Sequence, residues 1–133
     1  MIKTFKYKLY TSKKNRHLVK EIQLAAEIYN HCIALHKRYY RRCGKYLNKY
    51  RLQKHLTKLK GREKYKHWNN LNSQAIQDVT DRIHKGYENF FRWCKTKQGS
   101  KVRPPSFKKR QKYKSYTLKQ TGYKEAIRRI YPN

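Results

Sequence analysis

Apolar and basic residues alternate at the start of the chain. The apolar positions are Phe5, Tyr7 and Leu9, and the positions between them are Lys6 and Lys8. A period of two residues is typical of a strand with one buried face, because successive side chains of a strand point to opposite sides. The pattern therefore predicts a strand over residues 3–9.

The period of the apolar residues then changes to that of an amphipathic helix. Thr11 and Ser12 can cap the N-terminus of this helix, and Gly44 can end it in the left-handed conformation. The apolar stripe between them follows i, i+3, i+4, i+7 spacing and comprises Leu18, Ile22, Ala25, Tyr29, Cys32, Ile33, His36 and Tyr40. This spacing predicts one long helix whose whole stripe lies in the core.

Two further helical patterns follow. Asn48 can cap a second helix that ends near Gly61, and Asn72 with Ser73 can cap a third. The second stripe is Leu52, Leu56 and Leu59, and the third is Ile76, Val79, Ile83, Tyr87, Phe90 and Cys94. We expect the first and third helices to pack antiparallel, with the second closing the bundle.

The composition changes after residue 97. A Gly-Ser loop is followed by Pro104 and Pro105, which prevent a helix and favour extended backbone. We predict a loop or strand over residues 106–114 and a strand over 115–120. The expected fold class is therefore α+β, mainly helical, with three helices inserted between strands. The expected divisions are 1–11 for the first strand, 12–98 for the helices, and 99–133 for a basic loop and incomplete further strands.

The charge of the chain is strongly one-sided. Its 133 residues include 36 Lys and Arg but only 7 Asp and Glu, which gives a net charge of +29 with neutral histidines. This excess favours a polyanionic partner, because charge of one sign at such density otherwise causes self-repulsion. The 13 tyrosines add rings that can stack on bases. The composition predicts a folded nucleic-acid-binding protein.

The sequence favours no membrane partner. Its first residues lack the apolar region of a secretory signal, and no apolar stretch approaches the about 18 residues of a membrane span. Its 3 cysteines form no CxxC pair, which is typical of reduced thiols inside a cell. We expect a cytoplasmic protein.

Two arrangements of polar residues suggest metal chemistry. Asp78, Asp81 and Glu88 could bind Mg²⁺ from one helix, but each has basic residues at helical spacing, which favours charge pairs within the helix. A possible zinc set lies on a single helix without CxxC support and comprises His31, Cys32, His36 and Cys43. Cys32 and Cys94 fit better as small core residues. Cofactor, nucleotide and hydrolase motifs are also missing, so we expect no catalytic residue, no metal and no cofactor.

Basic residues and tyrosines are interleaved in short clusters, such as residues 39–42 and 112–116. One surface of this kind can both neutralise phosphates and stack bases. The residues expected to contact RNA or other phosphates are Lys6, Lys8, Arg41, Arg42, Lys108, Lys109, Arg110, Lys112 and Lys114.

Several motifs occur in an order that resembles a known family. In chain order they are Ile2–Tyr10, Tyr29-Asn30-His31, Gly44-Lys45, Leu52–Leu59, Asn72–Gln77, Tyr87–Arg92 and Pro105–Lys109. Over residues 1–121 they resemble the N-terminal part of the TnpB (OrfB) proteins of insertion-sequence transposons. That family is similar to the compact type V CRISPR effectors.

The resemblance implies a fold and two partners. In the family, strands form a wedge, a barrel of the oligonucleotide-binding type, and the inserted helices form a recognition lobe with a helix-turn-helix-like arrangement. A guide RNA and duplex DNA are bound, and a short transposon-adjacent DNA motif is read between wedge and lobe. The resemblance therefore implies a partial β-barrel here. The residues that fall where the family contacts the DNA motif are Lys49, Tyr50, Ser73, Gln74, Gln77 and Thr121.

The nuclease domain of the family would lie beyond residue 133. We therefore expect a chain that is not itself an enzyme: a truncated or split family member, a gene remnant or an excerpt, with a separately encoded or downstream nuclease domain as a further partner. Two other interpretations stay open. One is a free-standing basic RNA-binding protein of ribosomal or RNA-chaperone type, and the other is a Mg²⁺ enzyme using the three carboxylates named above.

Overall fold

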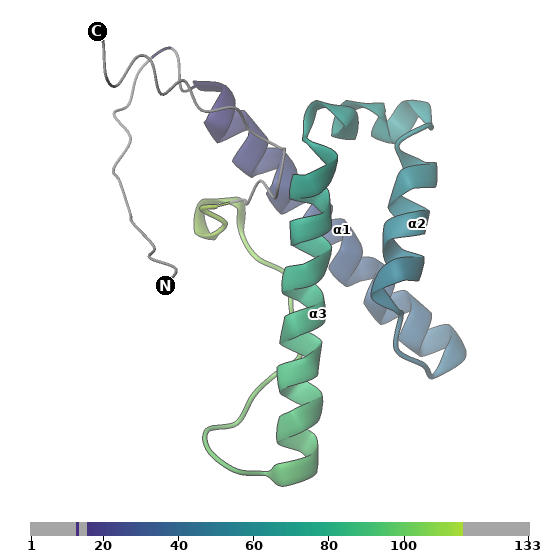
Figure 1. Cartoon of the computed structure of the whole chain (residues 1–133), viewed down its shortest axis with the longest axis vertical. Coiled ribbons are helices and arrows are strands. Elements are labelled where there is room, and N and C mark those ends of the chain that lie inside the picture. The colour runs from purple at the N-terminus through teal and green to yellow at the C-terminus, as the bar shows by residue number, and fades with distance from the viewer. Residues whose placement is uncertain (1–12, 14–15, 116–133) are drawn as a thin grey trace, which may run out of the picture.

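The computed structural model describes residue 13 and residues 16–115 (Figure 1). Its elements are α1 (Arg16–Cys43), α2 (Lys49–Leu59), the 3₁₀ helix η2 (Glu63–Asn70), α3 (Ser73–Thr96) and the short 3₁₀ helix η3 (Arg110–Lys112). The strand expected over residues 3–9 lies outside the described residues, as does all but the first residue of the strand expected over 115–120. None of the helices in the described ranges is long and apolar enough to cross a bilayer.

The helix boundaries follow local signals in the sequence. Asn48 Oδ1 and Asn72 Oδ1 each accept a hydrogen bond at 2.8 Å from the backbone N–H two residues on, which caps α2 and α3. Gly44, with φ of +65°, follows the last residue of α1 in the left-handed conformation. These contacts confirm the predicted caps of the second and third helices and the predicted end of the first.

The three long helices follow one another down, up and down. In Figure 1, α1 and α3 both run from top to bottom and cross, while α2 runs upward beside α3. The prediction that the first and third helices are antiparallel is therefore wrong. Because α2 and η2 return the chain to the end at which α1 begins, α3 must run in the same sense as α1.

The core lies where the three helices meet. Its members are Ala25, Ala26, Ile28, Tyr29, Cys32, Ile33, Leu52, Leu56, Leu59, Trp68, Leu71, Ala75, Ile76, Val79, Ile83 and Tyr113. The predicted stripes are thus confirmed over their central parts. The prediction that Tyr40 and Cys94 lie in the core is wrong, since Tyr40 is 66% exposed and Cys94 is also exposed. Both lie near the C-terminal ends of crossing helices, where the helices have left the shared core.

An extended segment after α3 returns along the helices (Figure 1). Tyr29 donates its hydroxyl proton to the Ser106 carbonyl at 3.0 Å. Asn30 Nδ2 donates to the Lys108 carbonyl, and Asn30 Oδ1 accepts from the Lys108 N–H, each at 2.9 Å.

These helix side chains satisfy backbone groups that a neighbouring strand would otherwise pair with. Residues 106–114, expected as a loop or strand, therefore form no strand and include the 3₁₀ turn of η3. The predicted α+β fold with a partial β-barrel is wrong, because the described part of the chain is mainly helical and contains no strand.

Candidate nucleic-acid interface

The first turn of α2 lies against the middle of α3. Lys49 Nζ lies 3.2 Å from Asp81 Oδ1 and 5.2 Å from the centroid of the adjacent Tyr50 ring. One turn further along α2, Gln53 Nε2 donates to Thr80 Oγ1 at 2.8 Å. These contacts fix α2 on α3 and leave Tyr50 71% exposed. An exposed ring on a fixed helix end can stack on a base.

The other predicted DNA-contacting residues of the helices lie in the first two turns of α3. Ser73 and Gln77 are exposed and lie one turn apart on the same face, while Gln74 is half-buried. This face continues to Asp81, so it extends about 12 Å along the axis from Ser73. The structure therefore brings Gln77 within about one helical turn of the α2 N-terminus, whereas Ser73 lies at the far end of the face. Thr121 lies outside the described residues.

Basic side chains contact the carboxylates of α3. Arg82 Nε lies 2.8 Å from Asp78 Oδ2, and His84 Nε2 lies 2.8 Å from Glu88 Oε1, both at i, i+4 spacing. Asp81 pairs with the first residue of α2, as described above. The partners of Asp78 and Glu88 lie within α3, as the sequence favoured over a Mg²⁺ site, whereas the partner of Asp81 lies on α2 and was not predicted. In the described ranges, no three His, Cys, Asp or Glu side chains form a group that could hold a metal ion.

Five of the predicted phosphate-binding residues lie on one stretch, residues 108–114, which we call the basic stretch. All five are exposed: Lys108, Lys109, Arg110, Lys112 and Lys114. Asn30 fixes the backbone at its start, and Arg82 Nη1 donates to the Ser115 carbonyl at 2.9 Å just after its end. Between them the buried ring of Tyr113 packs on Tyr29, with 5.5 Å between ring centroids. The charges therefore project from a backbone that is anchored at three points.

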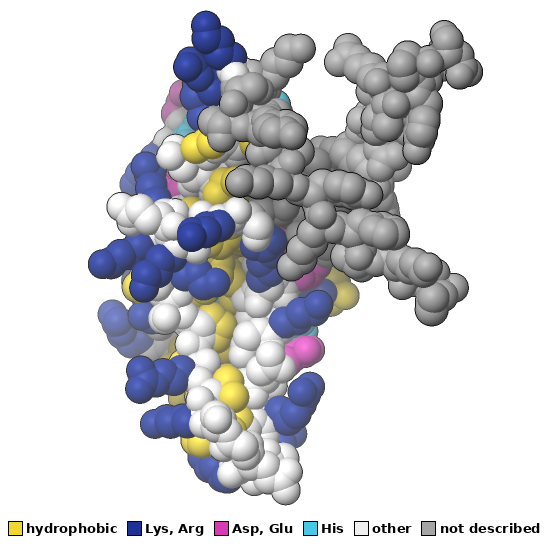
Figure 2. Space-filling model, turned by 90° about the vertical axis from the view of Figure 1, so that its left-hand side faces the viewer, with side chains coloured by type: hydrophobic (Ala, Val, Ile, Leu, Met, Phe, Trp, Pro, Cys, Tyr) yellow, Lys and Arg dark blue, Asp and Glu magenta, His cyan; other side chains and the backbone are white. Residues whose placement is uncertain are grey.

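The remaining predicted cations lie elsewhere. Arg41 and Arg42 are exposed in the last turn of α1, about 17 Å along the helix axis from Asn30. Lys6 and Lys8 lie outside the described residues. On the face shown in Figure 2, Lys and Arg side chains flank a narrow apolar strip along the height of the described part. Basic side chains thus lie on both sides of this strip in the described part of the face, an arrangement that suits a long polyanion.

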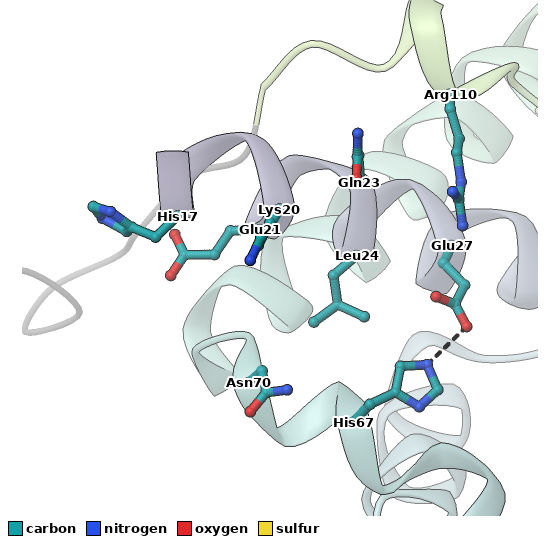
Figure 3. A pocket seen from close by; sticks show the side chains of 9 residues that line it. All are labelled: His17, Lys20, Glu21, Gln23, Leu24, Glu27, His67, Asn70 and Arg110. Atoms are coloured by element: carbon teal, nitrogen blue, oxygen red, sulfur yellow. Dashed lines mark hydrogen bonds and ion pairs between the residues drawn. The ribbon is translucent and has the colours of Figure 1, made fainter. Parts of the chain in front are cut away.

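A pocket between α1, η2 and the basic stretch has mixed charge (Figure 3). Glu27 Oε1 contacts His67 Nε2 at 2.9 Å and accepts from Trp68 Nε1 at 3.4 Å. Arg110 points from the basic stretch toward Glu27, and Glu21 also lines the pocket (Figure 3). Two carboxylates repel a phosphate, so this pocket is a poor anion site despite Arg110.

Sequence reasoning missed an aromatic cluster between the C-terminal halves of α1 and α3. The rings of His36 and Tyr46 stack with 5.5 Å between centroids, and His36 lies 4.8 Å from Tyr87. Tyr46 Oη lies 2.8 Å from His84 Nδ1. The other nitrogen of the same imidazole, Nε2, contacts the carboxylate of Glu88, so the three side chains form one polar chain.

Burial, the nearby Tyr87 and the Glu88 carboxylate raise the pKa of Tyr46 to about 12. The hydroxyl is therefore held protonated, which does not suit a nucleophile. The sequence signal was present, because Tyr46 and Phe90-Phe91 flank basic residues, but the rings could equally have belonged to the core.

No protein-family model matches the chain, and no curated protein matches it. The resemblance to TnpB proteins therefore depends on the ordered motifs alone.

Proposed function

We propose that the protein binds RNA and duplex DNA in the cytoplasm as the nucleic-acid-binding portion of a TnpB-like, RNA-guided system. The observation that carries this proposal is the basic stretch, whose exposed cations project from an anchored backbone. A chain with 36 basic and 7 acidic residues attracts phosphates from a distance. The ordered motifs favour a transposon-associated guide RNA as the polyanion.

The basic stretch and the last turn of α1 are the proposed RNA contacts. Their side chains are long and exposed, and each phosphate that they neutralise releases condensed counterions. Contacts of this kind hold an RNA without reading its sequence.

The face formed by the start of α2 and the start of α3 is the proposed DNA contact. Gln77 offers an amide that can bond to the edge of adenine, and Tyr50 offers an exposed ring. The Lys49 ammonium already pairs with Asp81 at 3.2 Å, so a phosphate would compete with that carboxylate. Base reading is therefore assigned to Gln77 and Tyr50 more than to Lys49.

The proposed role is binding without cleavage. The carboxylates of Asp78, Asp81 and Glu88 are each engaged by a basic partner. A downstream or separately encoded nuclease domain would supply the chemistry. The alternative, a free-standing RNA-binding protein of ribosomal or RNA-chaperone type, has the same charge but requires no motif in duplex DNA.

The first test is the salt dependence of RNA binding by the full chain. Contacts with six to ten phosphates predict that affinity falls about 10³- to 10⁵-fold between about 50 and 200 mM salt. A variant with five Gln substitutions should lower the slope of log K against log salt by about 3.5 to 4.5. Its changed positions are Lys108, Lys109, Arg110, Lys112 and Lys114.

A matched control removes five exposed charges from α2, η2 and the turn between them instead. Its Gln substitutions are at Lys54, Lys58, Arg62, Lys64 and Lys66. The proposal expects a smaller change in slope for this control than for the variant of the basic stretch. A flat salt plot for the wild-type chain contradicts polyanion binding, and equal slopes for the two variants contradict a role for the basic stretch.

The second test is a selection of binding sites from randomised DNA duplexes, with and without RNA. A TnpB-like protein should enrich a short motif, and Gln77→Ala should weaken binding to it by about 1 to 3 kcal/mol. Gln23→Ala, at an exposed Gln of α1, is the control and should leave the motif unchanged. If no motif is enriched under either condition, the free-standing RNA-binding protein is the better description.

A further inference from the structure

An open aromatic pocket lies between the C-terminal halves of α1 and α3 and the connection between α1 and α2. Its volume is about 420 Å³, in the range of small-ligand sites. The rings that line it include those of His36, Tyr46, Tyr87 and Phe91. In the sequence, Tyr46 belongs with Lys45 to one of the clusters of basic residues and tyrosines, but the other three rings were not assigned to nucleic-acid binding.

The rings hold one another in fixed orientations. Tyr46 meets Phe91 edge to face, with 5.4 Å between centroids and an interplanar angle of 90°. Tyr87 lies 5.9 Å from Phe91 and 4.8 Å from His36. Phe91 is nevertheless 40% exposed. A preformed ring surface that stays open to water gains stability when a flat apolar ligand covers it.

The rings of His36 and Tyr46 in the pocket are uncharged near neutral pH. Burial and the neighbouring His84 lower the pKa of His36 to about 4, and the pKa of Tyr46 is raised to about 12. His36 is 5% exposed, and no hydrogen bond joins its ring nitrogens to other residues within the described ranges. A neutral imidazole has one donor and one acceptor nitrogen, which match the polar edge of a nucleobase.

Cations stand at the rim of the pocket. Lys37 and Lys45 are exposed and line it. The Lys37 ammonium lies 4.4 Å from the centroid of the Phe107 ring, which holds it at the rim. Arg41 follows Lys37 by one turn of α1. An apolar peptide would cover the rings but would leave these charges without a counterpart, whereas a nucleotide supplies both a flat ring and a phosphate.

From this juxtaposition we infer that the pocket binds an unpaired nucleotide of an RNA, with its base against Phe91 and its phosphate at Lys37 and Lys45. A base inside a duplex is stacked on both faces and cannot enter. The inference depends on the proposed RNA binding and adds a preference for single-stranded positions, which the basic stretch alone does not provide.

The test compares two RNAs of equal charge with the full chain. One is a fully paired hairpin, and the other is a shorter hairpin with an unpaired tail that carries 2-aminopurine. Phe91→Leu retains apolar volume but removes the aromatic face, so it should weaken tailed RNA about 5- to 150-fold and leave paired RNA within about twofold. Phe91→Tyr should retain wild-type affinity, and the fluorescence change of 2-aminopurine on binding should disappear in Phe91→Leu alone.

Trp93→Leu is the matched control, because Trp93 is also an aromatic residue of α3 but does not line the pocket. It should behave as the wild type with both RNAs. Equal loss for paired and tailed RNA in Phe91→Leu, or no loss for either, overturns the pocket assignment. If the wild type binds both RNAs with a steep salt dependence and no preference, the pocket assignment fails and the proposed function stands. If neither RNA binds in a salt-dependent way, the proposed function fails as well.

Discussion

Gly86 lies in the middle of α3, where the extended segment after that helix packs against it, so a substitution of Gly86 tests this packing. A Cβ atom built on Gly86 would lie 2.7 Å from Pro105 Cγ, 3.6 Å from Pro105 Cδ and 3.7 Å from Pro105 Cβ. Carbon atoms are attracted most strongly at about 3.5 to 4.0 Å, so the first contact is about 1 Å too short. Gly86 thus lets the segment lie directly on α3, and any side chain there must displace it.

Two opposing effects determine how much Gly86→Ala changes the free energy of unfolding. Replacing a glycine inside a helix by alanine stabilises the helix by about 1 kcal/mol. Overpacking against the rigid proline ring costs about 1 to 3 kcal/mol. We therefore expect the free energy of unfolding to stay equal or to fall by up to about 2 kcal/mol. In a Pro105→Ala background the clash is removed, so the same substitution should stabilise by about 1 kcal/mol.

Urea unfolding of the four proteins, followed by circular dichroism, measures this cycle. The cycle cancels the separate effect of Pro105→Ala on the unfolded chain and leaves the coupling energy between the two sites. The expected coupling is about 1 to 3 kcal/mol, the cost of the clash. If Gly86→Ala stabilises the protein equally in the wild-type and Pro105→Ala backgrounds, the segment does not pack on α3 and the anchored backbone of the basic stretch is refuted.

Two further predictions concern the same helical body. Asn30→Ala removes both hydrogen bonds to the Lys108 backbone, so we expect a loss of about 1 to 2 kcal/mol and faster amide exchange at Lys108; unchanged exchange would refute the anchor. Because the folded pKa of His36 lies below the ordinary 6.5, at about 4, its contribution to stability is complete above pH 6.5 and is lost as the pH falls toward 4. This contribution to the free energy of unfolding amounts to about 3 kcal/mol. Unfolding measured at several pH values should therefore show a weaker acid dependence for His36→Phe than for the wild type. Equal dependence would contradict a buried neutral imidazole.

Local signals were sufficient to predict the three long helices, although not the 3₁₀ helices η2 and η3. The Asn48 and Asn72 caps form because a side-chain oxygen satisfies an N–H that the helix leaves unpaired, and that chemistry needs no tertiary contact. Gly44 ends α1 for a similarly local reason. The central parts of the apolar stripes are buried because a helix with one apolar face has to cover it.

The arrangement of the helices depends on contacts that no local pattern contains. The relative direction of α1 and α3 depends on the return path through α2 and η2. The exposure of Tyr40 depends on where two helices diverge, although its spacing fits the stripe. The sequence left residues 106–114 as a loop or a strand, and the structure has no strand there because Asn30, which lies 78 positions before Lys108, satisfies the backbone of Lys108.

The sequence likewise predicted one part of the candidate interface and not the rest. Exposure of the basic stretch follows from its charge, which disfavours burial. The pairing of Lys49 with Asp81 joins two helices and was not visible in the sequence, although it decides how much charge the first turn of α2 can offer to a phosphate. The aromatic pocket was missed because its rings come from three separate segments, each of which alone resembles ordinary core.

The three candidate regions offer different side-chain chemistries for the proposed binding of nucleic acid. The basic stretch offers exposed cations, the start of α2 and α3 offers an amide and an exposed ring, and the pocket offers a neutral ring surface with two rim lysines. Phosphate attraction responds to salt, amide contacts respond to base identity, and stacking responds to strand pairing. Since the regions share no side chain, each response can be removed by its own substitution while the others remain. A single diffuse basic surface would instead lose all three together, which is the distinction that the proposed variants are designed to measure.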